Sequence, residues 1–165
     1  MIILAMAPVR SAQAVDCAAI ANIYNEAISE GRSTFETERR SATDIEGWLE
    51  SPLLVGTIGG DVAGWARLTP YSPRACYSGI AEGSVYVRAS RRGHGLGGAL
   101  AGALTEEAER AGLHKIVGKL FADNEVSRRL VARHGFREVG VHLSHGQIDG
   151  EWRDVVLVEK LLGSG

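Results

Sequence analysis

The chain has 165 residues, 45% of them apolar, which is the size and composition expected of one compact domain over residues 1–165. Its formal net charge is −2, from 18 Lys and Arg against 20 Asp and Glu, so charge gives no reason to expect nucleic acid or a membrane as a partner. The two cysteines are too few for a secreted disulfide framework and the apolar residues 1–9 lack a basic leader, so we expect a cytoplasmic protein that binds small solutes. Residues 1–9 are interpreted as an extended segment, with Met6 as a second possible start.

Two helices are predicted before the first strand. Apolar residues recur at helical spacing over residues 17–30, with Asp16 placed to accept hydrogen bonds from the first free backbone amides and Gly31 placed to end the helix. A second helix is expected over residues 41–50, stopped by Pro52.

A hairpin and a surface loop follow. Residues 53–58 and 62–68 are rich in β-forming side chains and flank Gly59-Gly60-Asp61, a pattern typical of an antiparallel hairpin. Residues 69–80 contain two prolines and a glycine, which predicts a loop across the surface.

The second half alternates strand and helix patterns. We expect strands over residues 83–87, 115–121, 136–143 and 152–161, and helices over 96–111 and 126–134. Gly112 and Gly135 are placed to end those two helices. The order of elements implies a mixed α/β layer structure.

The most informative segment of the sequence is a β-rich run that passes through a basic, glycine-rich turn, residues 88–95, into a helix. Glycines allow a ligand to approach the backbone closely, and the unpaired amides of a helix's first turn direct partial positive charge at an anion. Arg91 and Arg92 are placed to add charge-assisted hydrogen bonds to phosphate oxygens. The segment therefore predicts a pyrophosphate-binding loop.

Other interpretations of this loop fit less well. Gly93-x-Gly95-x-x-Gly98 satisfies the dinucleotide fingerprint, but the loop follows a hairpin instead of a first strand, and the position where an acidic ribose ligand belongs is Gly118. The Gly-Lys-Ser/Thr of a nucleotide-triphosphate loop is absent. A glycine-rich turn without a ligand is the remaining alternative, disfavoured by the conformational entropy that so many glycines lose on folding.

Two signatures stand in the second half of the chain: Arg92-x-x-Gly95-x-Gly97, and then Asn124, Ser127, Leu130 and Gly135-Phe136. In this order and spacing they resemble the signatures of the GNAT acetyltransferase superfamily. The resemblance implies an α/β (α+β) fold in a single domain, with a mixed, mostly antiparallel central sheet flanked by helices on both faces. It also implies acetyl-CoA as cosubstrate and no metal.

Carried over residue by residue, the resemblance assigns the cosubstrate contacts to one run of residues and to the start of a later helix. These residues are Val85, Tyr86, Val87, Arg92, Gly93, His94, Gly95, Leu96, Gly97, Gly98, Asn124 and Ser127. Backbone amides near Tyr86 and Val87 are expected to meet the thioester carbonyl as an oxyanion hole does. Asn124 is expected to contact the pantetheine side, to cap the following helix, or both. The five histidines show none of the usual close zinc-ligand spacings.

Further motifs cover nearly the whole chain: Ile23-Tyr24-Asn25, Ser33-Thr34-Phe35-Glu36, Arg74-x-x-Tyr77, Glu82-x-Ser84-Val85-Tyr86-Val87 and Gly150-x-Trp152-x-Asp154-Val155. Together they resemble the phosphinothricin and methionine sulfoximine acetyltransferase branch of the superfamily. That branch implies acetylation of the α-amine of a glutamate-like compound by a homodimeric enzyme.

Glu82 is the residue onto which the resemblance places the general base. An ammonium cannot attack a thioester, whereas a carboxylate acting directly or through a water can remove its proton. A solvated loop glutamate is the alternative for Glu82. For the acceptor pocket we expect Arg74 to clamp a carboxylate or phosphinate, with Phe35 and Tyr77 as walls; a solvated arginine and ordinary aromatic packing are the alternatives.

Two positions depart from the family pattern. Val131 stands where the family places a tyrosine or histidine to protonate the leaving thiolate, and Asp149 stands where the branch has an aromatic residue or histidine. The first departure leaves the proton donor unassigned and makes a non-catalytic acyl-CoA-binding module a competing hypothesis. The second predicts an acidic pocket wall. Peptide N-termini, polyamines and aminoglycosides are alternative acceptors.

Overall fold

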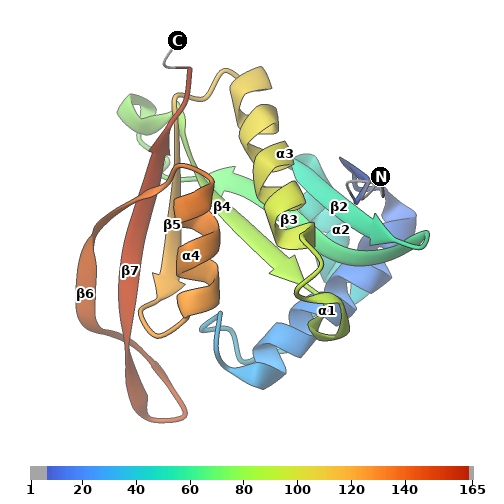
Figure 1. Ribbon diagram of the computed structural model, residues 1–165, viewed down its shortest axis with the longest axis horizontal. Coiled ribbons are helices and arrows are strands. Elements are labelled where there is room, and N and C mark those ends of the chain that lie inside the picture. The colour runs from blue at the N-terminus through green and yellow to red at the C-terminus, as the bar shows by residue number, and fades with distance from the viewer. Residues whose placement is uncertain (1–6, 164–165) are drawn as a thin grey trace, which may run out of the picture.

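The fold is one seven-stranded sheet with helices on both faces, as the family resemblance implies (Figure 1). The computed structural model describes residues 7–163. The sheet order is β1-β2-β3-β4-β5-β7-β6, and every neighbouring pair is antiparallel except β4 and β5. The strands are β1 (Val9–Ser11), β2 (Leu53–Ile58), β3 (Asp61–Pro70), β4 (Ile80–Val87), β5 (Lys115–Phe121), β6 (Arg137–Ile148) and β7 (Glu151–Leu161). The helices are α1 (Cys17–Glu30), α2 (Ala42–Glu46), α3 (Leu96–Arg110) and α4 (Glu125–Arg133).

Helices α1 and α2 cover one face of the sheet, and α3 and α4 cover the other (Figure 1). On the α1 face, Ile20 and Ile23 pack with Trp65 of β3 in a buried cluster. On the α3 face, Leu100 and Leu104 pack on Leu68 and other apolar side chains of the sheet. Burying both faces of the central strands accounts for their near-continuous apolar sequence. No helix within residues 7–163 is long and apolar enough to cross a membrane.

Helix α1 has the bounds that the periodicity predicts, and Gly31 ends it in the left-handed region, with φ 63°. The expected cap by Asp16 is wrong. A short 3₁₀ turn (Ala14–Asp16) precedes the helix, so the Asp16 carboxylate points back and accepts hydrogen bonds from the Gln13 amide at 2.8 Å and from the Arg10 guanidinium at 2.7 and 2.9 Å. Arg10 is on β1, so this carboxylate joins the first strand to the helix.

Other segments differ from expectation where long-range pairing decides the structure. The second predicted helix is shorter, because α2 ends at Glu46 and a 3₁₀ turn (Gly47–Glu50) completes it. The predicted loop over 69–80 shrinks, because Pro70 pairs with Ala81 and so β3 continues further. Of the extended segment expected over residues 1–9, residues 1–6 lie outside the described residues, and β1 starts at Val9.

The parallel pairing between β4 and β5 is short, and this decides where a site can form. Only three residue pairs join the two strands, the last being Glu82 with Val117. Beyond that point β4 stays paired with β3 as far as Val87, and β5 stays paired with β7 as far as Phe121. The sheet therefore opens between two well-supported strands.

Candidate active site

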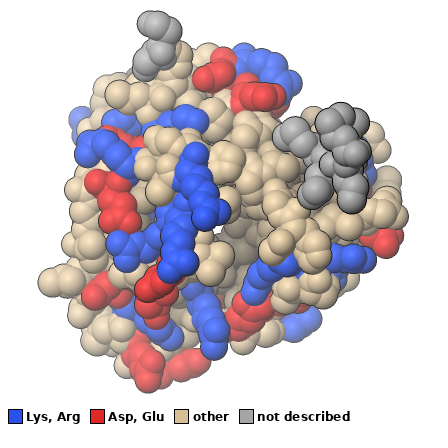
Figure 2. Space-filling model, viewed as in Figure 1, with Lys and Arg blue, Asp and Glu red and all other residues tan. Residues whose placement is uncertain are grey.

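A cavity of about 500 Å³ occupies the opening between β4 and β5. On the α1 face its lining includes Phe35, Glu82 and Lys119, and on the other face Asn124 and Leu130. The cavity thus passes through the sheet and is reachable from both layers of helices. Figure 2 shows the α3 and α4 face hollowed near its middle. Two ligands that approach from opposite faces of the sheet can meet inside it.

Strand β4 offers unpaired amides to this opening. The Arg88 amide donates to the Ala63 carbonyl of β3 at 2.7 Å, and alternation along an antiparallel strand then directs the Tyr86 amide to β3 as well. The amides of Val85 and Val87 consequently point to the β5 side, where the partner strand has turned away. Of the two amides expected near the thioester, Val87 therefore faces the opening and Tyr86 does not.

Tyr86 contributes its side chain instead. Its hydroxyl donates to the Ser33 carbonyl at 3.3 Å, its ring stacks on Trp65 with centroids 4.8 Å apart, and it lines the cavity. Burial raises the pKa of the Tyr86 hydroxyl well above its ordinary value. The neutral phenol therefore positions the segment that carries Phe35.

Glu82 lies at the point where the two strands separate. Alternation along β4 places its side chain on the same face as Tyr86, toward α1. One carboxylate oxygen is 3.3 Å from Nζ of Lys119 on β5, and 31% of the side chain is exposed. The structure thus places the predicted base in the lining of the cavity, partly exposed to solvent and beside a cation.

The glycine-rich loop is open toward solvent and rich in free amides. Gly93 and Gly95 both have φ 80°, and a Cβ placed on either would meet no atom within 4 Å. Within residues 7–163, no hydrogen-bond acceptor is found for the amides of Leu96, Gly97 and Gly98 at the start of α3. These features fit a pyrophosphate, whose oxygens would accept hydrogen bonds from the amides.

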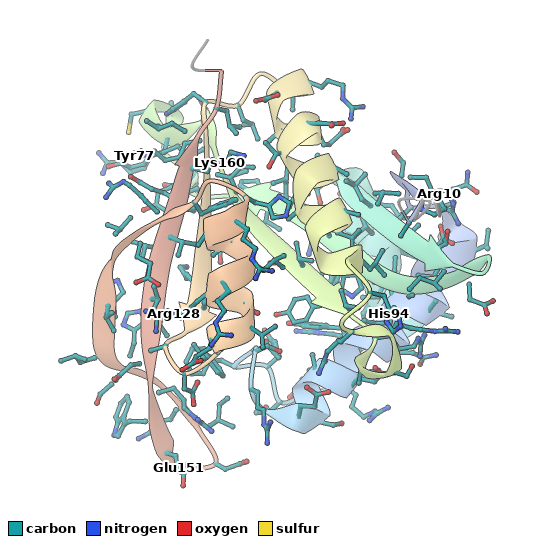
Figure 3. The ribbon with its side chains drawn as sticks, viewed as in Figure 1. Arg10, Tyr77, His94, Arg128, Glu151 and Lys160 are labelled. Atoms are coloured by element: carbon teal, nitrogen blue, oxygen red, sulfur yellow. The ribbon has the colours of Figure 1, made fainter. Side chains whose placement is uncertain are left out.

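Helix α1 holds this loop in place through ion pairs. Glu26 accepts from the Arg88 guanidinium and the Ala89 amide, each at 3.0 Å. Arg92 pairs with Glu30 at 3.1 Å and donates from Nε to the Val87 carbonyl at 3.3 Å. Arg92 therefore braces the loop against α1 as well as carrying charge beside it. His94 lies on the same loop, with Nδ1 3.0 Å from the Arg92 carbonyl (Figure 3).

The start of α4 forms the other side of the cavity. The Asn124 side chain accepts from the Ser127 amide at 3.1 Å, so the predicted helix cap is confirmed and the Asn124 amide nitrogen stays available as a donor. Leu130 and Val131 follow on the cavity side. Because Val131 is apolar, it cannot supply a proton.

On the α1 face, where the acceptor is expected, the cavity contains residues beside Phe35 that the motifs did not reveal. Phe35 packs against Phe121 with ring centroids 4.7 Å apart, and Gly146 of β6 lies against the Phe35 ring. His145 also lines the cavity and stacks on His142. The predicted strand over 115–121 contains Lys119 and Phe121, which are two residues apart and so share one face, but the shift in strand register between His142 and Gly146 left no local sequence signal.

Three positions predicted for the acceptor pocket are not among the residues that line the cavity. Arg74 and Tyr77 lie at the opposite end of β4, where the Arg74 guanidinium sits over the Tyr77 ring at 5.6 Å (Figure 3). Asp149 is in the β6–β7 turn with φ 51°, followed by Gly150 with φ 78°, so it forms the turn and not the expected acidic wall. The roles assigned to Arg74 and Tyr77 remain predictions. Residues 7–163 contain no cluster of three or more His, Cys, Asp or Glu side chains able to hold a metal ion.

Comparison with known proteins finds relatives that match nearly the whole chain. The sequence is 32% identical over 160 residues to the L-methionine sulfoximine/L-methionine sulfone acetyltransferase of Pseudomonas aeruginosa, covering 93% of each chain. It is 31% identical over 156 residues to the phosphinothricin N-acetyltransferase of Streptomyces coelicolor, covering 89% of this chain and 91% of that protein.

A solved structure of a putative acetyltransferase from Salmonella typhimurium with its cofactor acetyl-CoA superposes with a TM-score of 0.92. It has 29% identity and covers 96% of this chain and 95% of that one. The sequence model of the acetyltransferase (GNAT) family matches residues 18–136, which include α1 except its first residue, strands β4 and β5 and the glycine-rich loop. The chain therefore belongs to the acetyltransferase (GNAT) family.

Proposed function

We propose that this protein transfers the acetyl group of acetyl-CoA to the α-amine of a small amino-acid-like acceptor of the phosphinothricin or methionine sulfoximine type. The observation that carries the proposal is the cavity between β4 and β5. Glu82 lines it on the α1 face, and on the other face its lining residue Leu130 lies against Gly97, which follows the glycine-rich loop. The similarity to enzymes named for these two acceptors supports the substrate class.

The α3 and α4 face would hold the cosubstrate. The free amides at the start of α3 would receive the pyrophosphate, and the Asn124 amide nitrogen would donate to the pantetheine arm. Acetyl-CoA supplies an acyl group activated as a thioester. The amides of Val85 and Val87 face the opening, so either can donate to the carbonyl oxygen as negative charge develops on it.

The α1 face would hold the acceptor. Glu82 takes a proton from the acceptor ammonium, directly or through a water, which frees the nitrogen lone pair for attack on the carbonyl carbon. A new N–C bond forms as the C–S bond breaks. Val131 occupies the position, two helical turns after Asn124, where the family has its acid. In this scheme the thiolate therefore takes its proton from solvent.

The test is thiol release from acetyl-CoA with methionine sulfoximine, phosphinothricin and a panel of other amino acids. We expect Glu82→Gln to lower kcat by about 10²- to 10⁴-fold, the usual contribution of a general base, while acetyl-CoA affinity measured by calorimetry is unchanged. Glu138→Gln, at an exposed ion pair on β6, is the matched control. Unaltered turnover in Glu82→Gln would contradict the assigned role.

Val131 makes a binding module without turnover the second candidate. That hypothesis expects tight acetyl-CoA binding and no thiol release with amino acids, peptides, polyamines or aminoglycosides. The homodimer implied by the family resemblance is part of the main proposal, and analytical ultracentrifugation of the full chain tests it.

A further inference from the structure

Lys119 occupies the acceptor side of the cavity, next to the proposed base. Lys119 lies on the same face of β5 as Val117 and Phe121, which are each two residues away. Phe121 packs against Phe35, so this is the α1 face. The Nζ of Lys119 is 3.3 Å from Glu82, and 51% of the Lys119 side chain is exposed. The ammonium group is therefore accessible from the space in which an acceptor would lie.

The charges around the cavity single out this lysine. Among the described residues that line it, the acidic side chains are Glu36 and Glu82, and Lys119 is the one lysine or arginine. Glu36 is already paired with Arg40 at 2.9 Å. The arginine predicted to clamp an acceptor, Arg74, is not part of the lining. A negatively charged acceptor group thus has the Lys119 ammonium as its partner among the described residues that line the cavity.

We propose that Lys119 binds the α-carboxylate of the acceptor, an inference that rests on the proposed function. When the acceptor enters, its carboxylate replaces Glu82 as the ion-pair partner of Lys119. An α-amino acid carries its ammonium and carboxylate on one carbon, so its two charges can replace the two halves of the Glu82–Lys119 pair. The ammonium then lies beside Glu82 and the carboxylate beside Lys119. Because an ion pair that is half exposed to solvent is weak, its opening opposes binding little.

This exchange also gives the site a means of selection. An amine without a carboxylate leaves the Glu82–Lys119 pair closed, so the base keeps its lysine partner. An amine with a carboxylate opens the pair and brings its own nitrogen to Glu82. Lys119 is thus a positioning residue that favours amino acids over polyamines and aminoglycosides.

A closely matched control exists on the same strand. Lys115 lies four residues earlier on β5, hence on the same face, and pairs with Glu159 at 2.9 Å. Lys115 does not line the cavity. Replacing Lys115 removes an ion pair from the same strand and the same face without touching the acceptor space.

The experiment compares methionine sulfoximine with its carboxamide, in which a neutral amide replaces the α-carboxylate. We expect Lys119→Met to raise KM for methionine sulfoximine by about 10- to 100-fold, as loss of a charge-assisted hydrogen bond predicts, with little change for the carboxamide. Lys119→Arg should recover much of the loss, and Lys115→Met should leave both acceptors unchanged. Acetyl-CoA affinity should be the same in all variants.

Equal effects of Lys119→Met on the two acceptors, or no effect on either, would overturn the role of Lys119. If the wild-type protein releases no thiol with any acceptor, the proposed function fails instead. Calorimetric titration of methionine sulfoximine into the CoA-bound protein then tests separately whether Lys119 binds the acceptor. Equal affinity in wild type and Lys119→Met rules out that role.

Discussion

Gly146 and Phe35 are in such close contact that a side chain at residue 146 would displace the Phe35 ring. A Cβ placed on Gly146 would lie 2.6 Å from two carbons of the ring, closer than side-chain atoms approach one another. Phe121 packs against the same ring, with the two ring centroids 4.7 Å apart. Gly146 therefore sets how far Phe35 can withdraw from the acceptor end of the cavity.

We predict that Gly146→Val pushes the Phe35 ring into the cavity and raises KM for the acceptor about tenfold, without changing acetyl-CoA affinity, because the loss of a well-fitted aromatic contact is worth about 1.4 kcal/mol. Steady-state kinetics at saturating acetyl-CoA measure this. Gly140→Val on the same strand is the control, since a Cβ there meets no atom within 4 Å. An identical KM in both variants would refute the prediction.

Gly95 gives a prediction for the phosphate loop. Gly95→Asp should weaken acetyl-CoA binding about 100-fold, because it adds a negative charge where the free amides would receive pyrophosphate. Calorimetry measures the affinity. Gly95→Ala separates backbone strain at φ 80° from charge and should cost much less affinity. Gly112→Asp, with φ 76° and equally open space at the end of α3, should leave binding unchanged. Wild-type affinity in Gly95→Asp would exclude this loop as the phosphate site.

Asn124 has two functions that different substitutions can separate. Serine also caps helices, so Asn124→Ser should keep the melting temperature close to that of the wild type while lowering acetyl-CoA affinity several-fold through loss of the amide donor. Asn124→Ala should lose the cap as well, about 1 kcal/mol of stability or roughly 2–4 °C in Tm. Thermal melts and calorimetry on the two variants provide the comparison. Undiminished affinity in Asn124→Ser would leave the residue with a capping role alone.

Asp16 links stability to pH. The side chain is 3% exposed, and hydrogen bonds from Arg10 lower the pKa of its carboxyl below the ordinary value. A lowered pKa in the folded state means that ionised Asp16 stabilises the protein above the unfolded-state pKa of about 3.9, and that this contribution is lost as the pH falls through the folded-state pKa. Asp16→Asn should lower the free energy of unfolding by about 2 kcal/mol at pH 7.

Urea titrations at pH 7, 5 and 3 measure the difference between wild type and Asp16→Asn, which should shrink only at the lowest pH. Asp61→Asn, at the exposed start of β3, is the control for a change of net charge. A difference that is as large at pH 3 as at pH 7 would show that the ionised carboxylate is not its source.

Local signals predicted the parts of the fold that local interactions determine. The bounds of α1, the β2–β3 hairpin and the glycine-rich loop follow from apolar spacing, Gly31 and the glycines of the turns, all visible in short stretches of sequence. Contacts between distant segments were less accessible. Pro70 belongs to a strand because Ala81 pairs with it, and Asp16 points toward Arg10 because it ends a 3₁₀ turn that precedes the helix.

The candidate site shows the same division. The motifs indicated Glu82, Phe35 and Asn124, and the structure brings all three to the cavity. Lys119 has no motif of its own, and its place beside Glu82 follows from the register of β4 against β5. The proximity of Gly146 to Phe35 depends on a change of register in β6 that no residue pattern marks.

The short pairing of β4 with β5 has a mechanical consequence. Strands β1–β4 and strands β5–β7 form two blocks, each internally antiparallel and joined to the other by three residue pairs. The last of these pairs, Glu82 with Val117, marks the closed end of the opening between the two blocks. If the separation of the two blocks changes as ligands enter, the change is smallest at this closed end. The proposed base, Glu82, therefore lies where such a change would displace its carboxylate least.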